Sequence, residues 1–120
     1  MLKKRIIPTL LYKEFGLVKG KHFNNSRRVG PVLPAINIYN ARGVDELICL
    51  DISASLNHED PDYELINDIS KFCFVPLTIG GGINNVDQVQ RLLEVGADKV
   101  TINSAAYNDK NLIENIANLY

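Results

Sequence analysis

The distribution of hydrophobic residues along the chain predicts strands that alternate with amphipathic helices. Short, almost continuous apolar runs are typical of strands buried on both faces of a parallel sheet. Such runs lie at residues 5–11, 46–52, 75–79 and 99–103. Apolar residues with helical spacing follow them at residues 32–41, 60–72, 86–93 and 111–119. The expected order is βαβαβαβα, which favours an all-parallel α/β sheet.

Two prolines and one glycine modify this pattern near the N-terminus. Pro8 lies inside the first apolar run, where it would remove a hydrogen-bond donor from a central strand. Gly16 precedes the segment Leu-Val-Lys-Gly at 17–20, which predicts a small hairpin-like extension of the first strand. Pro34 is compatible with the helix at 32–41 only within its first turn.

A five-residue pattern occurs twice, at residues 43–47 and 96–100. Each copy begins with glycine, has aspartate in third position and joins the end of a predicted helix to the start of a strand. A repeated two-unit block is typical of a barrel built from quarters. Chance similarity between two helix-to-strand junctions explains five residues equally well.

The length of the chain limits the fold to one domain, residues 1–120, with no second domain. A complete (β/α)8 TIM barrel takes about 250 residues and eight strands, whereas four strands are predicted here. We therefore expect the N-terminal (βα)4 half of such a barrel, with parallel strands and outer helices. Its open edges and inner face would be covered by a homodimer of half-barrels or by a C-terminal half. Because the chain ends with its fourth helix, truncation of a longer gene product is the simplest account.

Composition narrows the classes of partner. Apolar residues make up 46% of the chain and the formal net charge is −1, so nothing in bulk favours nucleic acid or an anionic membrane as a partner. No segment approaches the roughly 20 apolar residues of a membrane helix, and the N-terminal apolar run is too short for a signal peptide. We expect a cytoplasmic protein.

The cysteines and histidines do not predict a metal site. Cys49 and Cys73 lie in apolar segments without CxxC spacing, which favours buried free thiols over a disulfide. His22 and His58 are isolated in the sequence. We expect no metal and no organic cofactor.

Three consecutive glycines, Gly80 to Gly82, separate the third predicted strand from a helix that opens near Asn84 and Asn85. Backbone N–H groups without neighbouring Cβ atoms can approach an anion closely, and a helix N-terminus adds positive potential. The alternative is a tight turn that needs positive φ angles. We predict that Gly81 and Gly82 contribute to a phosphate site.

A second polar loop follows the fourth predicted strand. Asn103 and Ser104 place an amide and a hydroxyl before two alanines and a helical turn. In α/β barrels phosphate typically binds across adjacent loops at the carboxyl ends of the strands, so we expect these two residues to share the phosphate site. Alternatively, Ser104 only caps the turn.

Taken together, these segments resemble the HisF family, the cyclase subunits of imidazole glycerol phosphate synthase. The matching segments are KRII at 4–7, LVKG at 17–20, VDEL at 44–47, LDISAS at 50–55, TIGGGI at 78–83 and GADKVTINSAA at 96–106. The resemblance implies a barrel whose top face binds a long substrate with a phosphate at each end. Ammonia from a HisH-like glutaminase subunit would enter through the bottom of the barrel.

The resemblance also implies roles for charged residues. Lys19 and Asp51 would be catalytic and would line the reacting end of the substrate. Arg5, Glu46 and Lys99 match the ring of charges at the lower mouth of the barrel, where they would gate ammonia. Asp98 matches the contact with the glutaminase. Solvated charges at strand ends are the alternative, and strict alternation would place Glu46 and Asp51 on opposite faces unless a bulge intervenes.

One departure from the family lies at the end of the first strand, where histidine-pathway cyclases carry an aspartate and this chain has Leu11. A leucine cannot transfer a proton, and loss of a general acid or base typically costs about 10²–10⁴-fold in rate. The family's second catalytic aspartate belongs to the C-terminal half. Leucines here resemble a sister branch, the WbuZ-type proteins of glycosyl amidation in surface-polysaccharide (lipopolysaccharide) synthesis.

Three hypotheses follow. The leading one is a HisF-like subunit of a glutamine amidotransferase complex, in the sugar-amidating branch, that accepts ammonia and binds a phosphorylated substrate. The second is a true cyclase of histidine biosynthesis in which another residue replaces the acid. The third is a stand-alone, non-catalytic half-barrel that binds phosphate-bearing ligands. We expect these 120 residues alone to be inactive as an enzyme.

Overall fold

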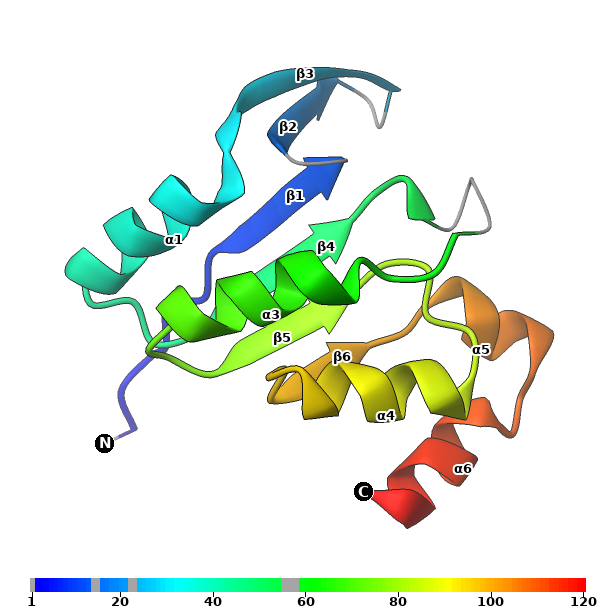
Figure 1. The fold of residues 1–120 in the computed structure, drawn as a ribbon. Helices are drawn as coiled ribbons and strands as arrows, with labels where there is room; N and C mark the ends of the chain where they lie inside the picture. The colour runs from blue at the N-terminus through cyan, green and yellow to red at the C-terminus, as the bar shows by residue number, and fades with distance from the viewer. Residues whose placement is uncertain (1, 14–15, 22–23, 55–58) are drawn as a thin grey trace.

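The computed structural model describes residues 2–13, 16–21, 24–54 and 59–120, in which a six-stranded sheet has the order β3-β2-β1-β4-β5-β6 (Figure 1). The strands are β1 (Thr9–Lys13), β2 (Gly16–Lys21), β3 (Asn24–Pro31), β4 (Leu47–Asp51), β5 (Leu77–Gly80) and β6 (Lys99–Thr101). The helices are α1 (Val32–Ala41), α3 (Tyr63–Phe72), α4 (Val86–Glu94), α5 (Ser104–Asn108) and α6 (Leu112–Leu119).

Four strands, β1, β4, β5 and β6, pair in parallel, as the hydrophobic pattern predicted. In the register of these ladders Leu11 pairs with Leu50, Leu50 with Gly80, and Gly80 with Thr101. The carboxyl ends of the four strands therefore meet at one edge of the sheet. This mostly parallel α/β sheet confirms the predicted fold class, that of a partial (β/α) barrel.

The prediction of an all-parallel sheet is wrong for β2 and β3, which form an antiparallel hairpin on β1. The expected extension at 17–20 is part of β2, but β3 was not predicted. Its sequence, NNSRRVGP, has no apolar alternation, so pairing with β2 rather than local pattern defines the strand. The short helix α5 is the helical turn expected after the fourth strand, and it begins at Ser104.

The first strand begins at Thr9, four residues later than predicted. Pro8 precedes it and has no backbone N–H, but its carbonyl oxygen accepts a hydrogen bond from Ile48 N at 3.0 Å. Residues 5–8 thus lead into the sheet without being part of β1. By contrast α1 has the predicted bounds, with Pro34 in its first turn.

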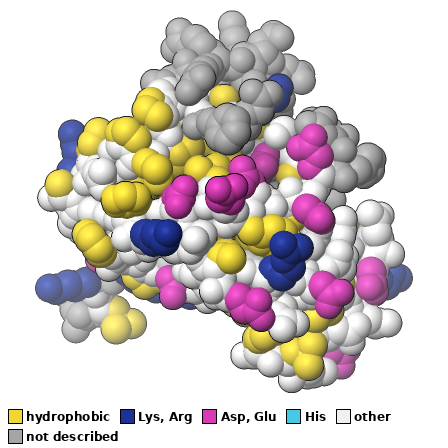
Figure 2. Space-filling view, in the orientation of Figure 1, with side chains coloured by type: hydrophobic (Ala, Val, Ile, Leu, Met, Phe, Trp, Pro, Cys, Tyr) yellow, Lys and Arg dark blue, Asp and Glu magenta, His cyan; other side chains and the backbone are white. Residues whose placement is uncertain are grey.

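The sheet has one face covered by helices and one open face. In β1, Leu10 and Tyr12 are buried, whereas Leu11 between them is 36% exposed. Figure 1 shows α3 and α4 lying in front of β5 and β6. In Figure 2, which shows this helical side, hydrophobic side chains gather over α1 and acidic ones are spread over α3 and α4. The core lies between the helices and the sheet.

The repeated five-residue pattern forms the same junction twice. Asp45 N donates to Ile6 O at 3.0 Å, and Ile6 N donates to Asp45 Oδ2 at 2.7 Å. Asp98 does the same with Leu77, at 2.9 Å through its backbone N and at 2.8 Å through Oδ2. Each aspartate therefore joins its strand to the neighbouring segment with both backbone and side chain, which explains why the third position is aspartate in both copies.

The cysteines are free thiols, as expected, but only Cys49 is fully buried. Cys73 was predicted to be buried but is only half-buried, and it donates a hydrogen bond to Val75 O at 3.3 Å. His22 and His58 lie outside the described residues. Within the described ranges, no helix is long and apolar enough to cross a membrane.

Candidate functional site

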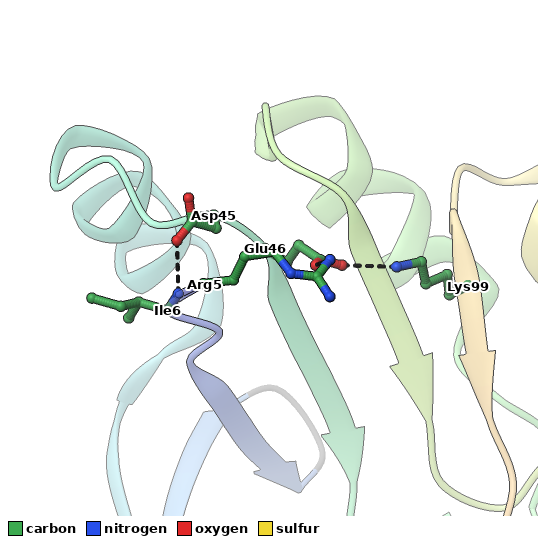
Figure 3. Close-up of polar contacts among 5 residues, drawn as sticks. All are labelled: Arg5, Ile6, Asp45, Glu46 and Lys99. Atoms are coloured by element: carbon green, nitrogen blue, oxygen red, sulfur yellow. Dashed lines mark hydrogen bonds and ion pairs between the residues drawn. The ribbon is translucent and has the colours of Figure 1, made fainter. Parts of the chain in front are cut away.

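A cluster of three charged residues lies where the parallel strands begin (Figure 3). Glu46 accepts from Arg5 Nη1 through Oε2 at 2.6 Å and from Lys99 Nζ through Oε1 at 2.9 Å. The side chain of Glu46 is only 8% exposed, whereas those of Arg5 and Lys99 are more than half exposed. The structure thus brings these three predicted residues together, and Glu46 is not a solvated strand-end charge.

The two cations stabilise the ionised form of Glu46. The hydrogen bond from Lys99 lowers the pKa of its carboxyl group most, and the charges of Lys99 and Arg5 lower it further, although burial opposes this. Asp98 lies close by in the sequence, but its carboxylate binds Leu77 N rather than a cation of this cluster. It is exposed, so a partner could still reach it.

Glu46 and Asp51 do not need a bulge between them. The ladders of β4 with β1 and with β5 run without a register shift, and Glu46 precedes the first strand residue, Leu47. Strand alternation therefore does not determine where the Glu46 side chain points. Asp51, the last residue of β4, is half-buried at the opposite end.

A cavity of about 450 Å³ lies at the carboxyl ends of β4, β5 and β6. Its walls include all four residues predicted to bind phosphate, together with Asp51. The described lining residues are Leu50, Asp51, Ile52, Ala54, Glu59, Gly81, Gly82, Ile83, Asn84, Thr101, Ile102, Asn103, Ser104, Ala105, Asn108 and Asp109. They include three carboxylates and neither lysine nor arginine, so an anion here would depend on N–H and O–H donors.

The carboxylate of Asp51 is held in a fixed orientation. Its Oδ1 atom accepts from Ser53 N and Ser53 Oγ, both at 2.8 Å, and from Ala54 N at 3.1 Å. Ser53 and Ala54 are buried. A side chain that is positioned by three donors is preorganised to orient a substrate or to exchange a proton with it.

The glycine loop has structural reasons for its composition. Gly81 has φ +102°, and a Cβ atom there would lie 2.1 Å from the carbonyl oxygen of Asp51. Gly82 has φ +70°. A Cβ atom at Gly80 would meet Thr101 Cγ2 at 2.2 Å. The tight-turn interpretation is therefore correct for Gly81 and Gly82.

The second loop is free of the capping role considered for it. Asn103, not Ser104, is the N-cap of α5, and no side-chain hydrogen bond caps this helix. Both side chains are exposed and line the cavity. Their amide and hydroxyl groups are thus available to a ligand.

Two other predicted positions lie away from these contacts. Lys19 is an exposed residue of β2 that pairs with Arg27 of β3, and it is not among the described residues that line the cavity. Leu11 does not line the cavity either, but it is the ladder partner of Leu50, which does. The structure therefore brings Asp51, but not Lys19, to the candidate site.

Sequence reasoning missed several residues around the cavity. Glu59, Asn108 and Asp109 contribute to its walls, and nothing in the local sequence marked them. Gln88 does not line the cavity, but its Oε1 atom accepts a hydrogen bond from the backbone N of the lining residue Asn84 at 2.7 Å. The spacing of Asn85 and Gln88, which matches a capping box, is the signal that could have identified it. Among the residues described, no group of histidine, cysteine and acidic side chains could hold a metal ion.

Comparison with known proteins identifies the family of the chain. The sequence profile described as histidine biosynthesis protein matches residues 5–120. The chain is 49% identical to a Campylobacter jejuni protein with the provisional name imidazole glycerol phosphate synthase subunit hisF2. It is 45% and 40% identical to the imidazole glycerol phosphate synthase subunits HisF of Pelodictyon phaeoclathratiforme and Exiguobacterium sibiricum.

Each of these comparisons covers 100% of this chain but 48% of the relative. The chain thus spans about half the length of the curated relatives that it matches. The match extends over both the charged cluster and the cavity-lining loops, because it includes every residue from Arg5 to Tyr120. The chain therefore belongs to the histidine biosynthesis protein family, and these relatives carry the name HisF.

Proposed function

We propose that this chain is the N-terminal part of a HisF-like subunit that receives ammonia from a glutaminase and binds a phosphate-bearing substrate. The observation that carries the proposal is the separation of two polar sites at opposite ends of the same parallel strands. The Arg5, Glu46 and Lys99 cluster lies at the strand starts, and the cavity lies at the strand ends. Membership of the histidine biosynthesis protein family supports the assignment of a role to each of these two sites.

In this proposal the substrate phosphate binds between the glycine loop and the loop after β6. The backbone N–H groups near Gly81 and Gly82, the Asn103 amide and the Ser104 hydroxyl supply donors. The carboxylates of Asp51, Glu59 and Asp109 also line the cavity and would repel a phosphate. The anion would therefore lie toward the donors, and Asp51 would face the reacting part of the substrate.

At the other end, the charged cluster would control the entry of ammonia. In this proposal Glu46, which binds both Arg5 and Lys99, would close the space between these cations, and ammonia would pass where the ion pairs open. The exposed Asp98 would contact the HisH-like glutaminase, and Lys19 would act with Asp51 in catalysis. Both roles rest on the family resemblance.

Leu11 favours the sugar-amidating branch over histidine biosynthesis. It stands where family cyclases have an aspartate, and on this open face of the sheet no carboxylate replaces it within β1. A subunit that only conducts ammonia to a sugar amidotransferase would not need that acid. We therefore propose the sugar-amidating branch for this chain.

The second candidate, a true cyclase, is favoured by the names of two relatives. Proteins 45% and 40% identical to this chain are named imidazole glycerol phosphate synthase subunit HisF. In that case another group, such as Asp51, would transfer the proton.

The first experiment measures thermal unfolding of the chain with inorganic phosphate or ribose 5-phosphate. A ligand that binds the native state at 100 times its Kd stabilises it by about 2.7 kcal/mol, which raises Tm by several degrees. An unchanged Tm at millimolar phosphate would refute the phosphate site. Sodium chloride at equal ionic strength serves as the control for general salt effects.

The second experiment separates the two branches. The chain is combined with the remaining part of the Exiguobacterium sibiricum relative, added as a second polypeptide, and supplied with ammonium salt and the phosphoribosyl formimino substrate of the cyclases. The sugar-amidating branch predicts no turnover for the wild type and a gain for Leu11→Asp. Turnover by the wild type within tenfold of the relative would favour the true cyclase.

A further inference from the structure

Gln88 is a buried polar residue that no step of the proposed function uses. It lies in the first turn of α4 and is 5% exposed. Its backbone N donates to Asn85 Oδ1 at 2.9 Å, which caps the helix. Its side-chain atoms Oε1 and Nε2 make two further hydrogen bonds.

These two bonds join both walls of the cavity. Gln88 Oε1 accepts from Asn84 N at 2.7 Å, and Gln88 Nε2 donates to Asp60 Oδ1 at 2.7 Å. Asn84 lines the cavity on the glycine-loop side, and Asp60 follows Glu59, which lines it on the side of the segment after β4. One amide thus connects Asn84 with Asp60, which lies 28 residues before Gln88 in the sequence.

Packing does not require an amide at this position. Val89 and Leu92 supply the buried apolar contacts of α4. A buried amide costs free energy unless both its donor and its acceptor find partners, and here both do. A capping function would be complete with the bonds to Asn85 and Asn84, so the link to Asp60 needs another explanation.

We propose that Gln88 is a positioning residue that fixes the glycine loop against the segment after β4 and thereby sets the affinity of the cavity for phosphate. The inference rests on the proposed phosphate site. Gln88 does not line the cavity, so it acts through Asn84 and Asp60. A loop that is already held in its binding geometry loses less conformational entropy when the ligand binds.

The donor and acceptor roles of this pair can be exchanged, which gives a sharp test. Gln88→Glu keeps the acceptor for Asn84 N but sets a second carboxylate against Asp60. Asp60→Asn in the same chain restores a hydrogen bond, because the new amide donates to the new carboxylate. Asp60→Asn alone leaves an amide oxygen that still accepts from Gln88 Nε2.

The readout is the Kd for inorganic phosphate, measured by titration calorimetry on the full chain, with Tm recorded for each variant. We expect Gln88→Glu to raise Kd about tenfold, corresponding to about 1.4 kcal/mol. The double variant should return within about threefold of the wild type, and Asp60→Asn alone should stay within the same range.

A matched control lies on the same helix. Gln90 Nε2 donates to Glu94 Oε1 at 3.0 Å on the exposed face of α4. Gln90→Glu therefore makes the same chemical change against a carboxylate, but away from the cavity, and should leave the phosphate Kd unchanged.

The outcomes distinguish this inference from the function on which it rests. If the unaltered chain does not bind phosphate, both are overturned. If the unaltered chain binds phosphate and Gln88→Glu lowers Tm without changing Kd, Gln88 is only a capping residue and this inference alone fails. Failure of the double variant to recover affinity would also refute the proposed link through Asp60.

Discussion

Lys99 Nζ donates to Glu46 Oε1 at 2.9 Å across the intervening strand β5, and the two residues occupy equivalent positions, 53 residues apart, in a repeated sequence pattern. Glu46 immediately precedes β4 and Lys99 is the first residue of β6. The pair therefore spans the start of the sheet from one repeat to the other (Figure 3). Because Arg5 binds the second oxygen of Glu46, the cluster ties together the starts of three parallel chain segments.

The pH dependence of stability should reveal this cluster. A carboxyl group whose pKa is lowered in the folded state stabilises the fold above its unfolded pKa, near 4.5, and that contribution is lost as pH falls through the folded value. We expect the Tm difference between the wild type and Glu46→Gln to be constant above about pH 5.5 and to shrink below pH 4.5. Tm measured from pH 3.5 to 7 tests this, and a pH-independent difference would contradict it.

Gly81→Ala should be far more harmful than the same change at Gly43. Both glycines have positive φ, which costs roughly 1–2 kcal/mol for a residue with a Cβ atom. A Cβ atom at Gly43 meets nothing within 4 Å, whereas at Gly81 it would lie 2.1 Å from the Asp51 carbonyl oxygen. Urea unfolding should show at least twice the loss of unfolding free energy for Gly81→Ala. Equal losses would mean that the loop can move freely away from Asp51.

Asn103→Ala should weaken phosphate binding without unfolding the chain. Since the Asn103 side chain does not cap α5, its loss should change the unfolding free energy by no more than about 0.5 kcal/mol. A hydrogen bond to an anion is worth about 1.5–3 kcal/mol, so Kd should rise at least about tenfold.

The matched control for this change is Asn111→Ala. Asn111 is likewise an N-cap without a side-chain cap bond, at the start of α6, and it does not line the cavity. Its phosphate Kd should equal that of the wild type. A similar loss of affinity in both variants would indicate a general effect on the C-terminal helices.

The two thiols should react at very different rates. Burial raises the pKa of the Cys49 thiol to about 12 from 9.0, so at pH 8 its thiolate fraction falls about 1000-fold. Burial also raises the pKa of Cys73, but this residue is half-buried. In the folded chain an aromatic disulfide reagent should modify Cys73 first. In Cys73→Ser, modification of Cys49 should occur only at the rate of unfolding, and rapid labelling of that variant would show an open core.

Features that depend on local chain chemistry could be predicted from the amino-acid sequence. The bounds of α1, the order of the four parallel strands and the glycine turn after β5 follow from hydrophobic periodicity and from the steric freedom of glycine. Each of these signals is contained within a single turn, helix or strand of the sequence. They also identified the cavity loops, because strand ends in a parallel sheet meet at one edge.

Contacts between distant groups could not be predicted in this way, because they depend on how the segments pack. The polar strand β3 exists because it pairs with β2, and the link from Gln88 to Asp60 exists because α4 packs beside the segment before α3. The tertiary structure also separated Lys19 from the cavity while holding Asp51 in it. Such contacts depend on register and packing between segments, and these are set by the summed burial of the whole sheet rather than by any local pattern.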